Sequence, residues 1–148
     1  MKSKILLALM LLSLSPAATA VEPAVTDARQ LVAMPAAAQA IMRDDMLDHL
    51  AALNEVLGYL AEDKLDAAAE TAETRIGRSA MGRNMGKARG MGPGRFMPDA
   101  MRSLGWGMHD AASEFARIAN SGDKLKAYAA LQPVMASCVA CHLSFRTR

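Results

Sequence analysis

Residues 123–145 read DKLKAYAALQPVMASCVACHLSF and predict the last helix of the fold. Asp123 follows the stop signal Asn120-Ser121-Gly122 and suits the N-cap position. Apolar or small side chains then recur every three or four residues, which is the period of an amphipathic helix. The expected buried seam consists of Tyr128, Leu131, Met135, Cys138, His142 and Phe145. Pro133 interrupts this run, so the helix should kink or restart there, because proline has no amide hydrogen to donate.

Three earlier segments of the chain repeat the same period. A first helix is predicted from about Pro35 to Ala61, and a second from about Lys64 to Ser79 with Asp63 as its N-cap. A third helix starts at Pro98, because proline suits a first helical turn. The expected buried positions are Met42, Met46, Leu50, Leu53, Leu57 and Leu60 in the first; Ala67, Ala68, Ala72 and Ile76 in the second; and Met101, Leu104, Met108, Ala111, Phe115 and Ile118 in the third.

The connections between these segments indicate how they are arranged. Only a few residues join the first helix to the second, so these two should be adjacent and antiparallel. Between Met81 and Met97 lie five Gly, one Pro and four basic residues, which predicts a long loop. No segment has the pattern of a strand. The sequence therefore predicts an all-α fold, an antiparallel four-helix bundle.

The last predicted helix carries a C-x-x-C-H motif, Cys138-Val139-Ala140-Cys141-His142. This spacing is typical of c-type haem attachment, in which two thiols add to the vinyl groups of one porphyrin and the histidine ligates the iron. A disulfide across two residues would be strained, and a thioredoxin-like pair would accompany a βαβ pattern. We therefore expect one covalently bound haem c near the C-terminal helix, presented to the bundle interior by Cys138 and His142.

The N-terminus has the three parts of a secretory leader. Two lysines precede an apolar run from Ile5 to Leu14, and Ala18-Thr19-Ala20 is a small-x-small cleavage site. The run is too short to span a membrane, which takes about 20 residues. We expect residues 1–20 to be a signal peptide cleaved after Ala20. Residues 21–148 should then form one periplasmic domain with no membrane span.

Charge and side-chain pairing argue against two classes of function. The full chain has 17 Lys and Arg against 15 Asp and Glu. Cleavage of the leader would remove Lys2 and Lys4 and no acidic residue, so the mature chain would carry no net formal charge. This gives no electrostatic case for binding nucleic acid or an anionic membrane. No nucleophile–base pair stands out, and the adjacent Asp44 and Asp45 face different ways on a helix, so an enzyme is not expected.

At the C-terminus the chain resembles a known family. The segment Ala130-Leu131-Gln132-Pro133-Val134-Met135, the motif at 138–142 and the closing Leu143-Ser144-Phe145-Arg146 are similar to the signature of the class II cytochromes c. These are cytochrome c′ and its low-spin relatives. The resemblance implies a four-helix bundle, thioether links at Cys138 and Cys141, His142 as the proximal iron ligand, and Arg146 beside the haem edge. A solvated terminal charge is the alternative for Arg146.

In that family the first helix supplies the residue over the distal face of the iron, a few positions after an arginine. Here Met46 and Leu47 lie three and four residues after Arg43. A ligating Met46 would give a six-coordinate electron carrier, because Met/His ligation is an established haem pairing. An apolar Leu47 in its place would leave a five-coordinate iron open to NO or CO. Met46 is favoured by its core-facing periodicity, although a methionine also fills irregular gaps in a core.

Two histidines are weaker candidates for the iron. His49 lies three residues beyond Met46 near the edge of the same stripe, and a partly buried, hydrogen-bonded role suits it better than ligation. His109 follows Met108 and is displaced from the seam, so we expect it at the boundary of the core or beside a haem propionate.

The long loop and its flanks also suggest a copper site. The segment is dense in thioethers, which suit Cu(I): Met81, Met85, Met91, Met97, Met101 and Met108. Met81 with Met85, and Met97 with Met101, have the one-turn spacing that could share a metal, and His109 could join them. The basic residues of the same region oppose cation binding and suit a docking surface or the haem propionates: Arg78, Arg83, Lys87, Arg89 and Arg95.

The sequence therefore predicts a monohaem c-type cytochrome that transfers electrons to and from redox partner proteins, with iron cycling between Fe(II) and Fe(III). A five-coordinate haem protein that binds NO or CO is the first alternative, and a Met-rich copper-binding protein is the second. Related bundles are often dimers, which implies a possible homodimer through the first two helices.

Overall fold

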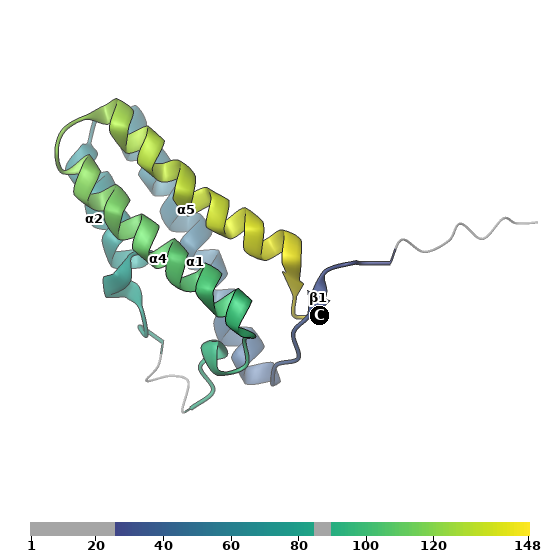
Figure 1. Ribbon diagram of the computed structural model, residues 1–148. Coiled ribbons are helices and arrows are strands. Elements are labelled where there is room, and N and C mark those ends of the chain that lie inside the picture. The colour runs from purple at the N-terminus through teal and green to yellow at the C-terminus, as the bar shows by residue number, and fades with distance from the viewer. Residues whose placement is uncertain (1–25, 85–89) are drawn as a thin grey trace, which may run out of the picture.

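The structure is a computed structural model that describes residues 26–84 and 90–148 (Figure 1). The described residues contain four α-helices, which confirms the all-α class: α1 (Ala36–Ala61), α2 (Leu65–Arg75), α4 (Asp99–Ala119) and α5 (Lys124–Ser144). Short 3₁₀ turns lie at Arg78–Ala80 and Pro93–Arg95. The predicted leader, residues 1–20 with cleavage after Ala20, lies outside the described residues.

The helices lie side by side and pack in a definite order of neighbours (Figure 1). Helix α1 packs against α2, α2 against α4, and α4 most extensively against α5. Within the described residues, α1 makes few close backbone contacts with α5 or with α4. None of the helices in the described ranges is long and apolar enough to cross a membrane.

A larger core cluster occupies the half of the molecule where all four helices meet. It is built on side chains with almost no exposure, Phe115, Leu60, Ile76, Val56 and Val134. Helix α2 contributes three buried alanines, Ala68, Ala69 and Ala72, whose small side chains allow the neighbouring helices to approach closely. Cys138 of the C-terminal motif packs against the edge of this cluster.

A smaller core cluster closes the other half, where the two ends of the described chain meet. It contains Val32, Met34, Ala38, Met101 and Phe145. Two short parallel strands cover it: β1 (Gln30–Leu31) pairs with β2 (Phe145–Arg146). The Val32 amide adds a hydrogen bond to the Arg146 carbonyl at 2.7 Å. The sequence did not predict these strands.

Helix boundaries agree with the prediction for α1, α4 and α5 and differ for α2. The Asp123 carboxylate caps α5 as expected, accepting from the Lys126 amide at 3.0 Å. Of the kink or restart predicted at Pro133, the restart is wrong, because α5 continues through this residue. Helix α2 ends at Arg75, and Asp63 is not its N-cap, because Asp63 adopts a left-handed φ of 59° and Lys64 precedes the helix without a side-chain cap.

The buried faces of α1 and α5 are rotated from the predicted seams. Helix α1 buries Ala52 and Val56, whereas the predicted Leu50 and Leu57 are exposed. The predicted seam residues Tyr128, Met135 and His142 of α5 are exposed. Helix α5 instead buries Ala127, Leu131 and Val134, with Cys138 and Cys141 half-buried, and Phe145 is buried just after the helix ends. Alanine and cysteine permit close helix contact, so the closest helix neighbours cover these narrow residues rather than the larger ones.

Helix α4 follows its predicted seam more closely. Met101, Met108 and Phe115 are buried as expected. The predicted Leu104, Ala111 and Ile118 are only partly covered, and the remaining buried positions are Ala112, Ala116 and Ala119.

Candidate functional site

Cys138 and Cys141 lie one helical turn apart on the same side of α5. Both thiols are free and half-buried. Cys138 packs against the larger core cluster, whereas Cys141 packs against the smaller one. The cysteine pair therefore sits where the two clusters of the core meet, and a group attached to both sulfurs would contact both halves of the fold.

The electrostatic environment of the cysteines does not activate them. Burial raises the pKa of the Cys138 thiol and of the Cys141 thiol, and the neighbouring Cys138 raises the pKa of Cys141 further. A reactive cysteine is usually a thiolate with a lowered pKa. The pair thus lacks the lowered pKa that is typical of a redox-active dithiol or a catalytic nucleophile.

His142 is exposed on α5. Lys124 marks its side of the helix, because the Lys124 Nζ is 2.6 Å from Oδ1 of Asp63 in the turn between α1 and α2. His142 is five full helical turns beyond Lys124 and therefore lies on the same side. Large apolar residues are exposed along this flank, namely Tyr128, Met135 and Val139.

Helix α1 presents a matching apolar flank. Its opposite flank faces α2, because Asp48 and Glu55 both pair with Arg75 of α2. The flank away from α2 carries exposed apolar side chains, Met46, Leu50 and Leu57. We call the six residues Met46, Leu50, Leu57, Tyr128, Met135 and Val139 the α1–α5 face. Two thiols at its border, an imidazole on it and this apolar surface are a donor set suited to a covalently attached haem.

Met46 and Leu47 are separated by their positions around α1. Met46 is 36% exposed and belongs to the α1–α5 face, whereas Leu47 is 60% exposed and turned about 100° away from it. Met46 also lines the cavity described below, and Leu47 does not. Of the two predicted candidates for the distal position, Met46 is the one on the same side as His142.

Arg146 lies in β2, where its carbonyl accepts the hydrogen bond from Val32. Its Nε is buried, has no hydrogen-bond partner among the described residues, and lies 3.6 Å from Oδ2 of Asp27. Hydrogen bonds from Arg29 lower the pKa of Asp27 to about 2, so this carboxylate is charged at neutral pH. Arg146 is therefore directed towards a carboxylate rather than out into solvent as a free terminal charge.

A cavity of about 470 Å³ lies on the other side of α1, between α1, the 80–97 connection and α4. Its lining contains five methionines and two histidines, Met42, Met46, Met81, Met97, Met108, His49 and His109. None of the lining residues given by the described chain comes from α5. The cavity is thus distinct from the site of the two cysteines and His142. Met46 lines the cavity and also belongs to the α1–α5 face.

The two histidines of this cavity lie close together, which the sequence did not predict. His49 is only 7% exposed, and its Nδ1 is buried without a hydrogen-bond partner in the described structure. The ring centroids of His49 and His109 are 6.1 Å apart in an edge-on arrangement. Burial, and secondarily His109, lowers the pKa of His49, so its ring is neutral at neutral pH. The period of α1 gave no signal for this role, because His49 stood at the edge of the predicted stripe.

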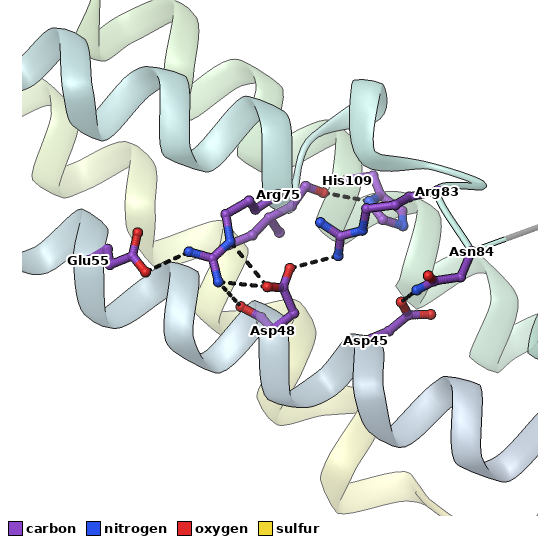
Figure 2. Close-up of polar contacts among 8 residues, drawn as sticks. Asp45, Asp48, Glu55, Arg75, Arg83, Asn84 and His109 are labelled. Atoms are coloured by element: carbon purple, nitrogen blue, oxygen red, sulfur yellow. Dashed lines mark hydrogen bonds and ion pairs between the residues drawn. The ribbon is translucent and has the colours of Figure 1, made fainter. Parts of the chain in front are cut away.

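A polar network holds the connection after α2 against α1 (Figure 2). Arg75 lies between Asp48 and Glu55 with contacts of 2.6 Å to each, and Arg83 reaches the other oxygen of Asp48 at 2.7 Å. The Asn84 amide donates to the Asp45 carboxylate. The hydrogen bond from Arg75, with the charge of Arg83, lowers the pKa of Asp48. These contacts fix the residues that cover the cavity.

No family model, curated protein or solved structure matches this chain.

Proposed function

We propose that this protein is a periplasmic monohaem c-type cytochrome with an antiparallel four-helix-bundle fold, and that it transfers electrons. The observation that carries the proposal is the position of the C-x-x-C-H motif. Cys138 packs against one core cluster and Cys141 against the other, and His142 is exposed on a helix that also exposes Tyr128, Met135 and Val139. Large apolar side chains that gather on the surface of a soluble protein often mark a site of interaction.

Each proposed ligand follows from its place in the fold. Cys138 and Cys141 would form the two thioether bonds, and His142 would ligate the iron on the proximal side. Met46 would supply the sixth ligand, since it lies on the flank of α1 away from α2 and is partly exposed there. The haem would supply the Fe(II)/Fe(III) couple, whereas the chain would supply ligation, an apolar environment and a docking surface for a redox partner protein.

One observation favours the alternative of a five-coordinate iron that binds NO or CO. The cavity beside α1 extends to Met46. If the thioether of Met46 does not ligate the iron, this space offers room for a diatomic molecule close to the distal position.

The absorption spectrum of the purified protein, recorded oxidised, reduced and with CO, tests the proposal. Expression should take place in a periplasm that attaches c-type haem. A low-spin spectrum with a Met-to-iron charge-transfer band and no response to CO supports the electron carrier. A high-spin spectrum that shifts with CO supports the gas-binding alternative. A Cys138→Ala/Cys141→Ala double variant is the control, because it should lose covalent haem, and wild-type protein without any haem would rule out both functions.

A further inference from the structure

We propose that the cavity between α1 and α4 is a binding site for one Cu(I) ion, with His49, His109 and at least one thioether among Met81, Met97 and Met108 as ligands. This site is separate from the proposed haem and does not rest on it. It collects soft and borderline donors from α1, α4 and the connection between α2 and α4 around a single space of about 470 Å³.

A contact with the backbone determines the tautomer of the His109 ring. Its Nδ1 lies 2.5 Å from the carbonyl oxygen of Ile76. A carbonyl oxygen only accepts hydrogen bonds, so Nδ1 carries the hydrogen and Nε2 of the neutral ring carries a free lone pair. Metal-binding histidines characteristically donate their other N–H to such a partner, which orients the ring and makes the ligating nitrogen more basic. His109 is therefore preset as a ligand.

His49 supplies the second nitrogen from the facing helix. Its buried Nδ1 has no partner among the described residues. An unsatisfied buried nitrogen costs free energy, and a bound ion would remove this cost. Centroids 6.1 Å apart suit two imidazoles on one ion, because each metal–nitrogen bond is about 2 Å and each centroid lies behind its nitrogen.

The choice of metal follows from the remaining donors. Within the described residues, no group of three or more His, Cys, Asp or Glu side chains is placed to hold a metal ion. The other metal-binding side chains that line the cavity are Asp45 and several thioethers, and thioethers select Cu(I) over harder ions such as Mg²⁺ or Ca²⁺. Met81, Met97 and Met108 line the same space as the two histidines.

The charges around the cavity permit a monovalent cation. Three arginines line it, and all are engaged elsewhere: Arg83 with Asp48 at 2.7 Å, Arg102 with Asp99 at 2.5 Å, and Arg95 with the Gly90 carbonyl at 2.8 Å. Asp45 adds a carboxylate to the lining. With neutral ligands, Cu(I) would bring a single positive charge, which this carboxylate can balance.

The proposed ligand set differs from the pairs that sequence spacing suggested. Met101 is buried in the smaller core cluster and does not line the cavity, so it is not placed to share a metal with Met97. Met85 lies outside the described residues. His49, which the sequence did not connect with copper, takes a central position instead.

The test is a Cu(I) titration of the full-length, haem-loaded protein under reducing, anaerobic conditions against a chromophoric Cu(I) chelator. Wild type should take up one Cu(I) per chain. His109→Asn keeps a donor for the Ile76 carbonyl but removes the ligating nitrogen, and His49→Ala removes the second ligand. Each removes a ligand and should therefore weaken Cu(I) binding by more than the loss of an outer-shell partner, which costs about 10- to 100-fold. Met101→Leu is the matched control and should bind as wild type does.

A second measurement needs no variant. X-ray absorption of the copper-loaded wild type should show both nitrogen and sulfur neighbours of copper. Scattering from nitrogen or oxygen alone would overturn the thioether assignment, and wild-type affinity in both histidine variants would overturn the site. An altered iron spectrum in copper-free His49→Ala would make His49 an iron ligand and would equally refute the proposal.

Discussion

Cys138 packs against the larger of two core clusters, and Cys141, one turn later on α5, packs against the smaller one. The cysteine pair therefore lies at a discontinuity of the core. A large apolar group bonded to both sulfurs would join the two clusters, and it would also cover the α1–α5 face, which includes Met46 and Met135.

Replacing Met46 by alanine should change the iron spectrum. We expect Met46→Ala to lose the Met-to-iron charge-transfer band, to shift towards high spin and to bind CO, because the sixth ligand is removed. The reduction potential should fall, since Met/His ligation raises it. Absorption spectra and a redox titration measure both changes.

Leu47→Ala is the matched control for this change, because Leu47 is the next residue of α1 and is 60% exposed. It should leave the spectrum and the potential unchanged. A spectrum of Met46→Ala that is identical to wild type would refute ligation by Met46. If Leu47→Ala alone altered CO binding, the distal position would belong to Leu47.

Arg146 should raise the reduction potential of the iron. Its guanidinium is partly buried beside the C-terminal end of α5, close to the proposed haem. A nearby positive charge disfavours Fe(III), so Arg146→Gln should lower the potential. Arg148→Gln, an exposed change two residues away, is the control. Equal potentials in the two variants would show that Arg146 does not influence the iron, and its role would then be limited to its contact with Asp27.

The helices were predictable because their period and their stop signals are local properties of the sequence. Asp123 follows Gly122 and caps α5, and Pro98 precedes α4, as expected. The strands were not predictable, because two-residue β1 and β2 exist only through pairing between the two ends of the described chain. Pro133 does not divide α5 into two helices, so only the restart among the two predicted effects is excluded.

The predicted seams failed where alanine competes with larger residues. Periodicity assigned Leu50 and Leu57 to the core, yet Ala52 and Val56 face the closest neighbours of α1. Close packing on α2 selects small side chains, and the sequence does not reveal which neighbour is closest. The spacing of the motif correctly predicted that both cysteines lie on one side of α5. The proximity of His49 and His109 was not predictable, because it depends on how α1 and α4 are oriented relative to each other.

The larger core cluster should determine stability independently of the motif. Leu60 has no exposure and belongs to this cluster. We expect Leu60→Ala to lower the free energy of unfolding by about 2–5 kcal/mol, through lost burial and the cavity left behind. Leu125→Ala, on a residue that is 82% exposed, should change it by less than about 0.5 kcal/mol. Denaturant unfolding measures both, and a similar loss in the two variants would contradict this picture of the core.

The pair between Asp48 and Arg75 should stabilise the fold only while Asp48 is ionised. The two side chains are partly exposed, so we expect Asp48→Asn to cost about 1–2 kcal/mol at neutral pH, between the values for exposed and buried pairs. Arg75 lowers the pKa of Asp48 below its ordinary value of 3.8. The stabilisation is therefore complete well above pH 3.8 and is lost as the pH falls through the lowered pKa.

The difference in unfolding free energy between wild type and Asp48→Asn should accordingly be constant from about pH 5 to 7 and shrink below about pH 4. Asp110→Asn is the control, because its pair with Arg78 is exposed on both sides and should contribute little at any pH. Denaturant unfolding at several pH values measures these differences. A difference for Asp48→Asn that persists undiminished at pH 2 would show that Asp48 acts through the geometry of its contacts and not through its charge.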